Sequence, residues 1–173
     1  MTSAAARPLP TEHAPYYAKY IEKVEGDDPI AALESEIAAT RALFARVDEE
    51  KSRFRYAPDK WSVREVVGHL IDAERVFGYR ALRIARGDAT PLSGFDENAY
   101  ARVAGHDATP LANLVREFDA LRRSHLLFFE HLAPEAWTRL GSANGDAVSV
   151  RALAFILAGH EKHHRTIVET RYL

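Results

Sequence analysis

The spacing of apolar residues is the feature that most constrains the fold of this chain. In four stretches, apolar side chains recur at steps of three and four residues, which is the period of one face of an α-helix. No segment shows the alternation of apolar and polar residues that is typical of a half-buried strand, and no internal repeat is present. Four long amphipathic helices in a chain of 173 residues predict an all-α protein built as a four-helix bundle.

Capping signals predict where these helices begin and end. Ser, Thr and Asp are favoured just before a helix, and proline is favoured in its first turn. The first helix should run to about residue 50, the second should end at Gly87, and the third should fade near Pro134. The four helices are expected to begin after Asp28-Pro29, Ser62 with Glu65 as a capping box, Thr109-Pro110 and Ser149.

The chain ahead of the first helix is expected to form a short N-terminal extension. We place this extension at residues 1–27 and the bundle domain at residues 28–173. Residues 1–15 are rich in alanine and proline, so we expect them to be mobile. The aromatic cluster at Tyr16–Ile21 is too short to be a domain and should pack on the bundle as a short helix or strap.

Two connections between the helices stand out. A long loop over residues 88–109 joins the second and third helices, and loops of such length in a compact domain often carry function. A second loop, rich in glycine and asparagine, spans residues 141–146 and leads into the fourth helix. Both are expected to be irregular, because neither shows helical or strand periodicity.

Composition excludes several kinds of chemistry and of partner. The chain has no cysteine, which excludes disulfides, thiolate metal sites, iron–sulfur clusters and a cysteine nucleophile. Its net charge is -2 and its pI is about 6.4, so it lacks the basic footprint of a nucleic-acid-binding domain. No run approaches the roughly 20 apolar residues that span a bilayer, and the first residues lack the apolar segment of a signal peptide. We therefore expect a soluble, cytoplasmic protein without nucleic-acid or membrane partners.

The fourth helix carries two histidines on its expected buried face. On a helical wheel at about 100° per residue, with His160 at the origin, the apolar stripe centres near 0°. His164 lies near 40° and His163 near -60°. His160 and His164 are thus one turn apart on the core side, with Cβ atoms about 5–6 Å apart, which suits coordination of one metal ion. Ordinary core histidines are the alternative, although two buried imidazoles would then both need partners.

A third histidine lies on the second helix. His69 is one turn from Val66 and from Ala73, on the flank of the apolar stripe. The second and fourth helices can meet in a bundle, so His69 could complete a set of three with His160 and His164. Three neutral imidazoles with an open position suit a catalytic Zn²⁺, or Ni²⁺, Fe²⁺ or Mn²⁺ completed by water. The alternative for His69 is a partly buried ring bonded to a carbonyl oxygen.

The segment from His160 to His164 also spells H-E-x-x-H, the metalloprotease helix in which Glu161 would be the general base. Only nine residues follow His164 to supply a third ligand, and no strand is expected to hold a peptide substrate. We therefore interpret Glu161 as an ordinary helix carboxylate. Phosphate-loop, dinucleotide-binding and nucleophile-elbow motifs are all missing.

Three arginines of the second helix form a basic stripe, which we interpret as a solvated face. They are Arg80, Arg83 and Arg86. Acidic residues elsewhere offset their charge. Arg80 differs from the other two because it lies on the same side of the helix as His69, where it could meet an anionic substrate.

Two segments of the chain resemble the DinB-like superfamily. The first runs from Tyr56 to Asp72 and contains the pattern W-S-x-x-E-x-x-x-H-L, and the second runs from Gly159 to His164 and contains H-x-x-x-H. The resemblance covers roughly residues 28–173 and implies a four-helix bundle that holds a divalent metal with three histidines. Carried over to this sequence, the ligands are His69, His160 and His164. The pattern selects His164 over His163, which leaves His163 to face a carboxylate, a water, a subunit interface or a ligand that it orients.

The resemblance also implies small-molecule chemistry. Members of the superfamily include S-transferases that use bacillithiol, mycothiol or glutathione, a maleylpyruvate isomerase, and proteins described as metal-dependent hydrolases. We expect a thiol-dependent S-transferase acting on small electrophiles, with a metal-dependent hydrolase or a non-enzymatic metal-binding bundle as alternatives. The expected cofactors are Zn²⁺ or Ni²⁺, with Fe²⁺ or Mn²⁺ as alternatives, and a low-molecular-weight thiol. A homodimer is compatible with this interpretation.

Access to a metal inside such a bundle should come from an end, because the helices close its sides. We therefore predict that the loop over residues 88–109 and the cluster Tyr16–Tyr20 border the metal pocket. Phe95, Asp96 and Tyr100 are the loop residues expected to contact substrate. The alternative is that the loop only covers the hydrophobic core.

Overall fold

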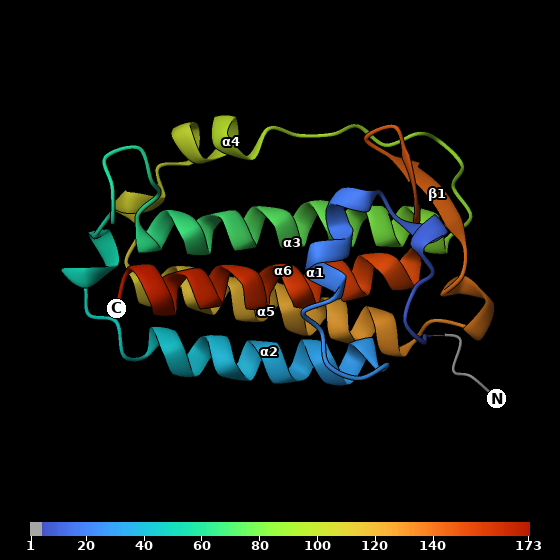
Figure 1. The fold of residues 1–173 in the computed structure, drawn as a ribbon, viewed down its shortest axis with the longest axis horizontal. Helices are drawn as coiled ribbons and strands as arrows, with labels where there is room; N and C mark the ends of the chain where they lie inside the picture. The colour runs from blue at the N-terminus through green and yellow to red at the C-terminus, as the bar shows by residue number, and fades with distance from the viewer. Residues whose placement is uncertain (1–4) are drawn as a thin grey trace.

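A computed structural model describes residues 5–173, and its four long helices form a closed bundle (Figure 1). Helix α6 packs against α2 and α3, and α5 packs against the same two helices from the other side. The all-α four-helix bundle is thereby confirmed. The bounds of the long helices are α2 Pro29–Phe44, α3 Val63–Ala85, α5 Leu111–Glu130 and α6 Val150–Arg171.

Shorter elements cover the ends and one side of the bundle. These elements are η1 Pro10–Glu12, η2 Pro15–Tyr17, α1 Ala18–Ile21, η3 Lys51–Arg53, α4 Glu97–Ala104, η4 His106–Ala108, η5 Pro134–Ala136, β1 Leu140–Ala143 and β2 Asp146–Ser149.

None of the helices within residues 5–173 is long and apolar enough to cross a membrane.

The predicted caps of three long helices are confirmed by their hydrogen bonds. The Asp28 carboxylate accepts from two backbone N–H groups in the first turn of α2, and Ser149 Oγ accepts from one in α6. Ser62 and Glu65 form the full capping box of α3. Helix α2 ends at Phe44 rather than near residue 50. The cause lies just beyond, where the Asp48 carboxylate accepts from the backbone N–H of Lys51 at 2.7 Å and favours a turn over further helix.

The loop expected at residues 141–146 is instead a β-hairpin. Strands β1 and β2 pair in antiparallel register, with Leu140 opposite Ser149 and Ala143 opposite Asp146. Asn144 and Gly145, between the strands, both have positive φ, 55° and 87°. Such a turn matches the twist of the strands and is favoured by the Asn-Gly dipeptide. The strands have only four residues each, too few to show alternation in the sequence.

The connection over residues 88–109 is not wholly irregular, because it contains helix α4. The Asp96 carboxylate accepts from two backbone N–H groups at the start of α4, and Gly105 ends it with φ of 67°. Ahead of α4, the backbone of Leu92 bonds to Ser142 and Asn144 of the hairpin at 2.9 Å. Figure 1 shows α4 lying above α3, against which it packs. The segment is thus fixed at both ends over one side of the bundle.

The chain ahead of α2 packs directly on the bundle. The expected mobility is wrong for residues 5–15, where the buried Glu12 carboxylate accepts from Ser149 Oγ and Arg151 Nε, both at 2.7 Å. Residues 1–4 lie outside the described residues. The expected short helix is confirmed as α1, which packs on α6 (Figure 1). The domain boundary that we place at residue 28 stays a prediction.

Helix α1 approaches α6 closely at a glycine next to His160. A Cβ atom on Gly159 would overlap the carbonyl oxygen of Tyr20, so only glycine lets the two backbones meet there. This contact places the Tyr20 side chain beside the His160 ring, with ring centroids 5.2 Å apart. The glycine before His160 therefore positions the wall of the site described below.

We expect Gly159→Ala to displace α1 and to lower the free energy of unfolding by about 1–2 kcal/mol. Overpacking costs about 1–3 kcal/mol, against a gain of up to about 1 kcal/mol from the higher helix propensity of alanine. Tryptic cleavage after Lys19 and Lys23 should accelerate in the folded variant. Gly78→Ala is the matched control, since its added Cβ meets the His125 ring on another face. Equal cleavage of the two variants would contradict the prediction.

Candidate metal centre

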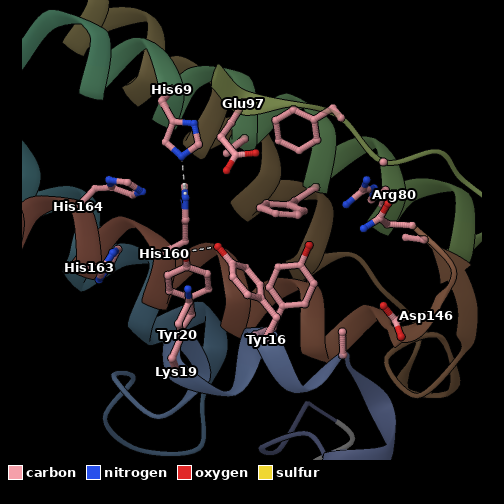
Figure 2. A pocket seen from close by; sticks show the side chains of 18 of the residues that line it. Tyr16, Lys19, Tyr20, His69, Arg80, Glu97, Asp146, His160, His163 and His164 are labelled. Atoms are coloured by element: carbon pink, nitrogen blue, oxygen red, sulfur yellow. Dashed lines mark hydrogen bonds between the residues drawn. The ribbon is translucent and has the colours of Figure 1, made fainter. Parts of the chain in front are cut away.

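The bundle brings three histidines from two helices to one point. His69 projects from α3, and His160 and His164 project from α6 (Figure 2). One nitrogen of each ring lies within 4.8 Å of one nitrogen of each of the others. The closest pair is His69 Nε2 and His160 Nε2, at 2.9 Å. The structure thus groups the three residues that the sequence singles out, whereas their role as ligands stays a prediction.

The surroundings keep these imidazoles neutral. His69 and His160 are buried, and His164 is half-buried. Burial, followed by the charge of His163, lowers the pKa of His69 to about 4. Burial and the neighbouring imidazoles also hold the pKa values of His160 and His164 well below the usual range. Neutral rings retain a nitrogen lone pair, which metal coordination requires.

Aromatic side chains form the walls around the three imidazoles. The Trp61 ring lies 4.8 Å from the His69 ring and 6.4 Å from the His164 ring, between centroids. Tyr172, just beyond the end of α6, donates its hydroxyl hydrogen to the Trp61 carbonyl at 2.6 Å and fixes this residue. The W-S-x-x-E-x-x-x-H pattern therefore has a physical basis: its tryptophan covers the histidines, its serine and glutamate cap α3, and its histidine joins the cluster.

His163 lies beside the cluster without joining it. Its ring contacts those of Tyr20 and His164, with centroids 5.3 and 5.1 Å apart, and it lines the adjoining cavity. Burial, together with the charges of Lys23 and Lys19, lowers its pKa. The predicted choice of His164 over His163 agrees with this grouping. A role for His163 in orienting a ligand stays a prediction.

A cavity of about 540 Å³ opens from the three histidines. This volume lies within the range of small-molecule sites. The Tyr16–Tyr20 cluster and the 88–109 segment both contribute to its lining, so the prediction that they border the pocket is confirmed. Phe95 lines the cavity. Asp96 instead caps α4, and Tyr100 packs its ring 5.3 Å from that of Phe95, so neither of these two lines it.

Four charged side chains line the cavity, and sequence reasoning missed three of them. Lys19 Nζ sits 3.7 Å from the centre of the Tyr16 ring, and Glu97 reaches in from the first turn of α4 (Figure 2). Asp146 comes from the hairpin and Arg80 from α3. Only Arg80 could be found beforehand, because it shares a helix face with His69. The other three depend on elements that carry no helical period in the sequence.

Glu161 is not an ordinary helix carboxylate, and it does not face the cavity. Its side chain is fully buried and forms an ion pair with the buried Arg122 of α5. Burial raises the pKa of Glu161, in spite of the attraction of Arg122. A general base must reach the reacting atoms. The location of Glu161 therefore supports the rejection of the metalloprotease interpretation.

The donor set fits a divalent transition metal. Two imidazole nitrogens that bind one ion at about 2.1 Å lie roughly 3.0–3.4 Å apart, depending on the angle between them. The His69 and His160 nitrogens, 2.9 Å apart, are close to this requirement, and all three nitrogens lie within 4.8 Å of one another, so side-chain rotations can bring the set to it. Three imidazoles leave coordination positions free on the cavity side, and such sets suit Zn²⁺, Ni²⁺, Fe²⁺ or Mn²⁺.

Together these features define a class of protein: an all-helical bundle that carries a three-histidine cluster on the wall of a small-molecule cavity. The chain belongs to the DinB superfamily, whose family model matches residues 32–168, well over half of its length. The predicted family is thereby confirmed.

Two relatives support this assignment. The chain is 26% identical over 137 residues to a protein of Geobacillus thermodenitrificans (strain NG80-2). That protein is named as a metal-dependent hydrolase by provisional assignment. That match covers 78% of this chain and 77% of the relative. The structure of YfiT from Bacillus subtilis, described as a probable metal-dependent hydrolase with an unusual four-helix bundle topology, superposes with a TM-score of 0.74. It is 15% identical and covers 94% of this chain and 89% of YfiT, which shows a shared fold.

Proposed function

We propose that this protein is a metal-dependent hydrolase of small molecules, with the ion held by His69, His160 and His164. The observation that carries the proposal is the convergence of three neutral imidazoles on the wall of a cavity of about 540 Å³. The names of the two relatives point to the same activity. No nucleic-acid or membrane partner has a part in this function.

The side chains around the cluster suit hydrolysis. A divalent cation held by the three histidines would supply Lewis acidity at this position. Glu97 is the carboxylate that we assign to accept the proton of the attacking water, because it lines the cavity on the same side as His69 (Figure 2). The Tyr20 hydroxyl stays protonated, since burial and its bond to the Tyr16 hydroxyl raise its pKa. Tyr20 can therefore donate a hydrogen bond to the oxyanion of the transition state.

A second candidate function is transfer of a low-molecular-weight thiol to an electrophile. The observation that favours it is a smaller cavity of about 220 Å³, which shares Trp61 and His164 with the first. Two cavities that share Trp61 and His164 in their linings would give room for two reactants near the same histidine. A thiol bound there would be held as the thiolate, the nucleophilic form. Thiol transfer stays a prediction.

A screen of the metal-loaded protein separates these functions. Chain purified without tags is loaded in turn with Zn²⁺, Ni²⁺, Mn²⁺ or Fe²⁺, and offered aryl esters and amides, or several thiols with a chlorinated or epoxide acceptor. Metal-dependent hydrolysis without thiol, diminished in Glu97→Gln at unchanged metal content, supports the proposal. Metal-dependent loss of thiol and acceptor together supports the transferase. Metal binding without turnover of either kind favours a bundle that acts through partners.

A further inference from the structure

A buried arginine lies in the cavity away from the histidines. Arg80 of α3 is only 3% exposed, so the expectation that it belongs to a solvated stripe with Arg83 and Arg86 is wrong. Its Nη2 donates to the Ser93 carbonyl at 2.7 Å. Within residues 5–173 it forms no ion pair with any carboxylate. Burial of a charged group without a counter-charge is costly, which suggests that its counter-charge comes with a ligand.

One face of α3 connects Arg80 to the metal centre. His69, Ala73, Phe77 and Arg80 follow one another at helical steps of four, four and three residues, and all four line the cavity. The first and last are separated by about 16 Å along the helix axis, at about 1.5 Å per residue. Figure 2 shows the imidazoles on one side of the cavity and Arg80 on the other. Ala73, in the middle, leaves room between them.

Aromatic rings form the walls between these two ends. The Arg80 guanidinium lies 5.5 Å from the centre of the Phe77 ring and 6.0 Å from that of Phe95. The segment formed by η2 and α1 adds a further wall, to which it contributes Tyr16, Tyr17 and Tyr20. Such walls suit a planar, apolar group, because paired rings attract one another beyond what the burial of their area contributes.

The charges that face the cavity favour an anionic ligand once a metal is present. Among the acidic and basic side chains that line the cavity, Lys19 and Arg80 balance Glu97 and Asp146. A divalent cation would add two positive charges. Asp146 lies at the Arg80 end (Figure 2), yet no ion pair joins the two. Of the five N–H groups of the guanidinium, one donates to the Ser93 carbonyl and another can donate to the Tyr17 hydroxyl, so N–H groups remain for a carboxylate.

We propose that Arg80 binds the carboxylate of the substrate, whose planar apolar body lies between the aromatic walls and whose reactive group reaches the three histidines. This proposal rests on the function proposed above, because the histidines supply the reacting end. It names the substrate class as small aryl-substituted carboxylic acids that carry a hydrolysable group. An aryl carboxylate with an ester or amide on the side of the ring away from the acid fits the description.

The test measures binding rather than turnover. Isothermal titration calorimetry compares 3-phenylpropanoate with its neutral analogue 3-phenylpropan-1-ol, on protein as purified and after dialysis against a chelator. Arg80→Met should weaken binding of the acid about 10- to 150-fold, the fold-change expected for a lost charge-assisted hydrogen bond of about 1.5–3 kcal/mol. Binding of the alcohol should change little. Arg86→Met, which removes the same charge from an exposed position outside the cavity lining, should bind the acid normally.

Arg80→Lys serves as the second variant, with melting curves recorded for all proteins. Lysine keeps the charge and loses the planar fork, so acid binding should fall less than in Arg80→Met. Equal affinity of the wild-type protein for acid and alcohol would overturn the proposal, as would normal acid binding by a folded Arg80→Met or Arg80→Lys variant. Arg80-dependent acid binding in chelator-treated protein would stand even if metal-dependent turnover were never found, so the two proposals fail separately.

Discussion

Replacement of His160 by alanine is expected to abolish metal binding. Its ring nitrogen lies 2.9 Å from that of His69 and belongs to the group of three that lies within 4.8 Å. Loss of a residue that only hydrogen-bonds to a metal ligand weakens metal affinity roughly 10- to 100-fold. Loss of a ligand itself should weaken metal affinity by more than this, because two imidazoles then have to hold the ion alone. His69→Ala and His164→Ala should behave in the same way. Mass spectrometry of protein purified without tags gives the metal content.

His163→Ala is the matched control for this experiment, because it removes a neighbouring imidazole on the same helix turn. The variant should keep its metal, since His163 lies outside the group of three. Circular dichroism and melting curves must show that all variants are folded. Full metal content in a folded His160→Ala protein would contradict the assignment. Loss of metal in His163→Ala with retention in His164→Ala would move the third ligand to His163.

The histidine cluster could be predicted from the sequence because it depends on helical periodicity. A wheel fixes the directions of His160 and His164, and the capping box fixes where α3 begins and so the direction of His69. Each statement concerns residues close together in the sequence. The bundle then needs only to bring two helices into contact, as α3 and α6 do.

The charged residues that complete the cavity could not be predicted one by one, because they belong to segments without such a period. Asp146 belongs to a hairpin whose strands have four residues each, and Glu97 belongs to an eight-residue helix inside an expected loop. The Asn-Gly turn at residues 144–145 is a recognised hairpin signal, and it could have been used. No local signal shows that the hairpin lies over α3 next to Arg80, since that depends on long-range packing.

Replacement of Arg122 by methionine is expected to be the most destabilising single change among the buried charges of the chain. Arg122 is fully buried and donates to both carboxylate oxygens of Glu74, at 2.8 and 2.9 Å, and to Glu161. Its Nη1 also donates to the Leu33 carbonyl at 3.3 Å. Methionine fills similar space but takes the guanidinium away from two buried carboxylates and leaves Glu74 with the His125 ring as its remaining partner. Breaking a buried pair in this way costs about 3–5 kcal/mol. Urea unfolding at pH 7 measures the loss.

A compensated variant tests whether the loss comes from the unpaired charges. Arg122→Met combined with Glu74→Gln and Glu161→Gln removes the whole set of charges and should regain most of the stability, because a neutral buried cluster avoids the desolvation of ions. Arg123→Met is the control, since this neighbouring arginine is exposed and forms only a surface pair with Asp119. It should cost less than about 1 kcal/mol. A decrease in unfolding free energy of less than about 1 kcal/mol in Arg122→Met would contradict the prediction.

The pH dependence of Arg122→Met gives a signature that simple loss of packing cannot produce. In the wild-type protein, burial alone would raise the pKa of Glu74, but Arg122 and His125 lower it to about 2, from an ordinary value of 4.5. This depressed pKa contributes stability above about pH 4.5 that is lost as the pH falls toward 2. Without Arg122, we expect burial to outweigh the contact that Glu74 keeps with His125 and to raise the pKa of both glutamates, so the folded variant binds more protons than its unfolded chain. Its stability must then decrease as the pH rises, and its deficit relative to the wild-type protein should be larger at pH 8 than at pH 5. A deficit that does not change with pH would show that lost packing dominates.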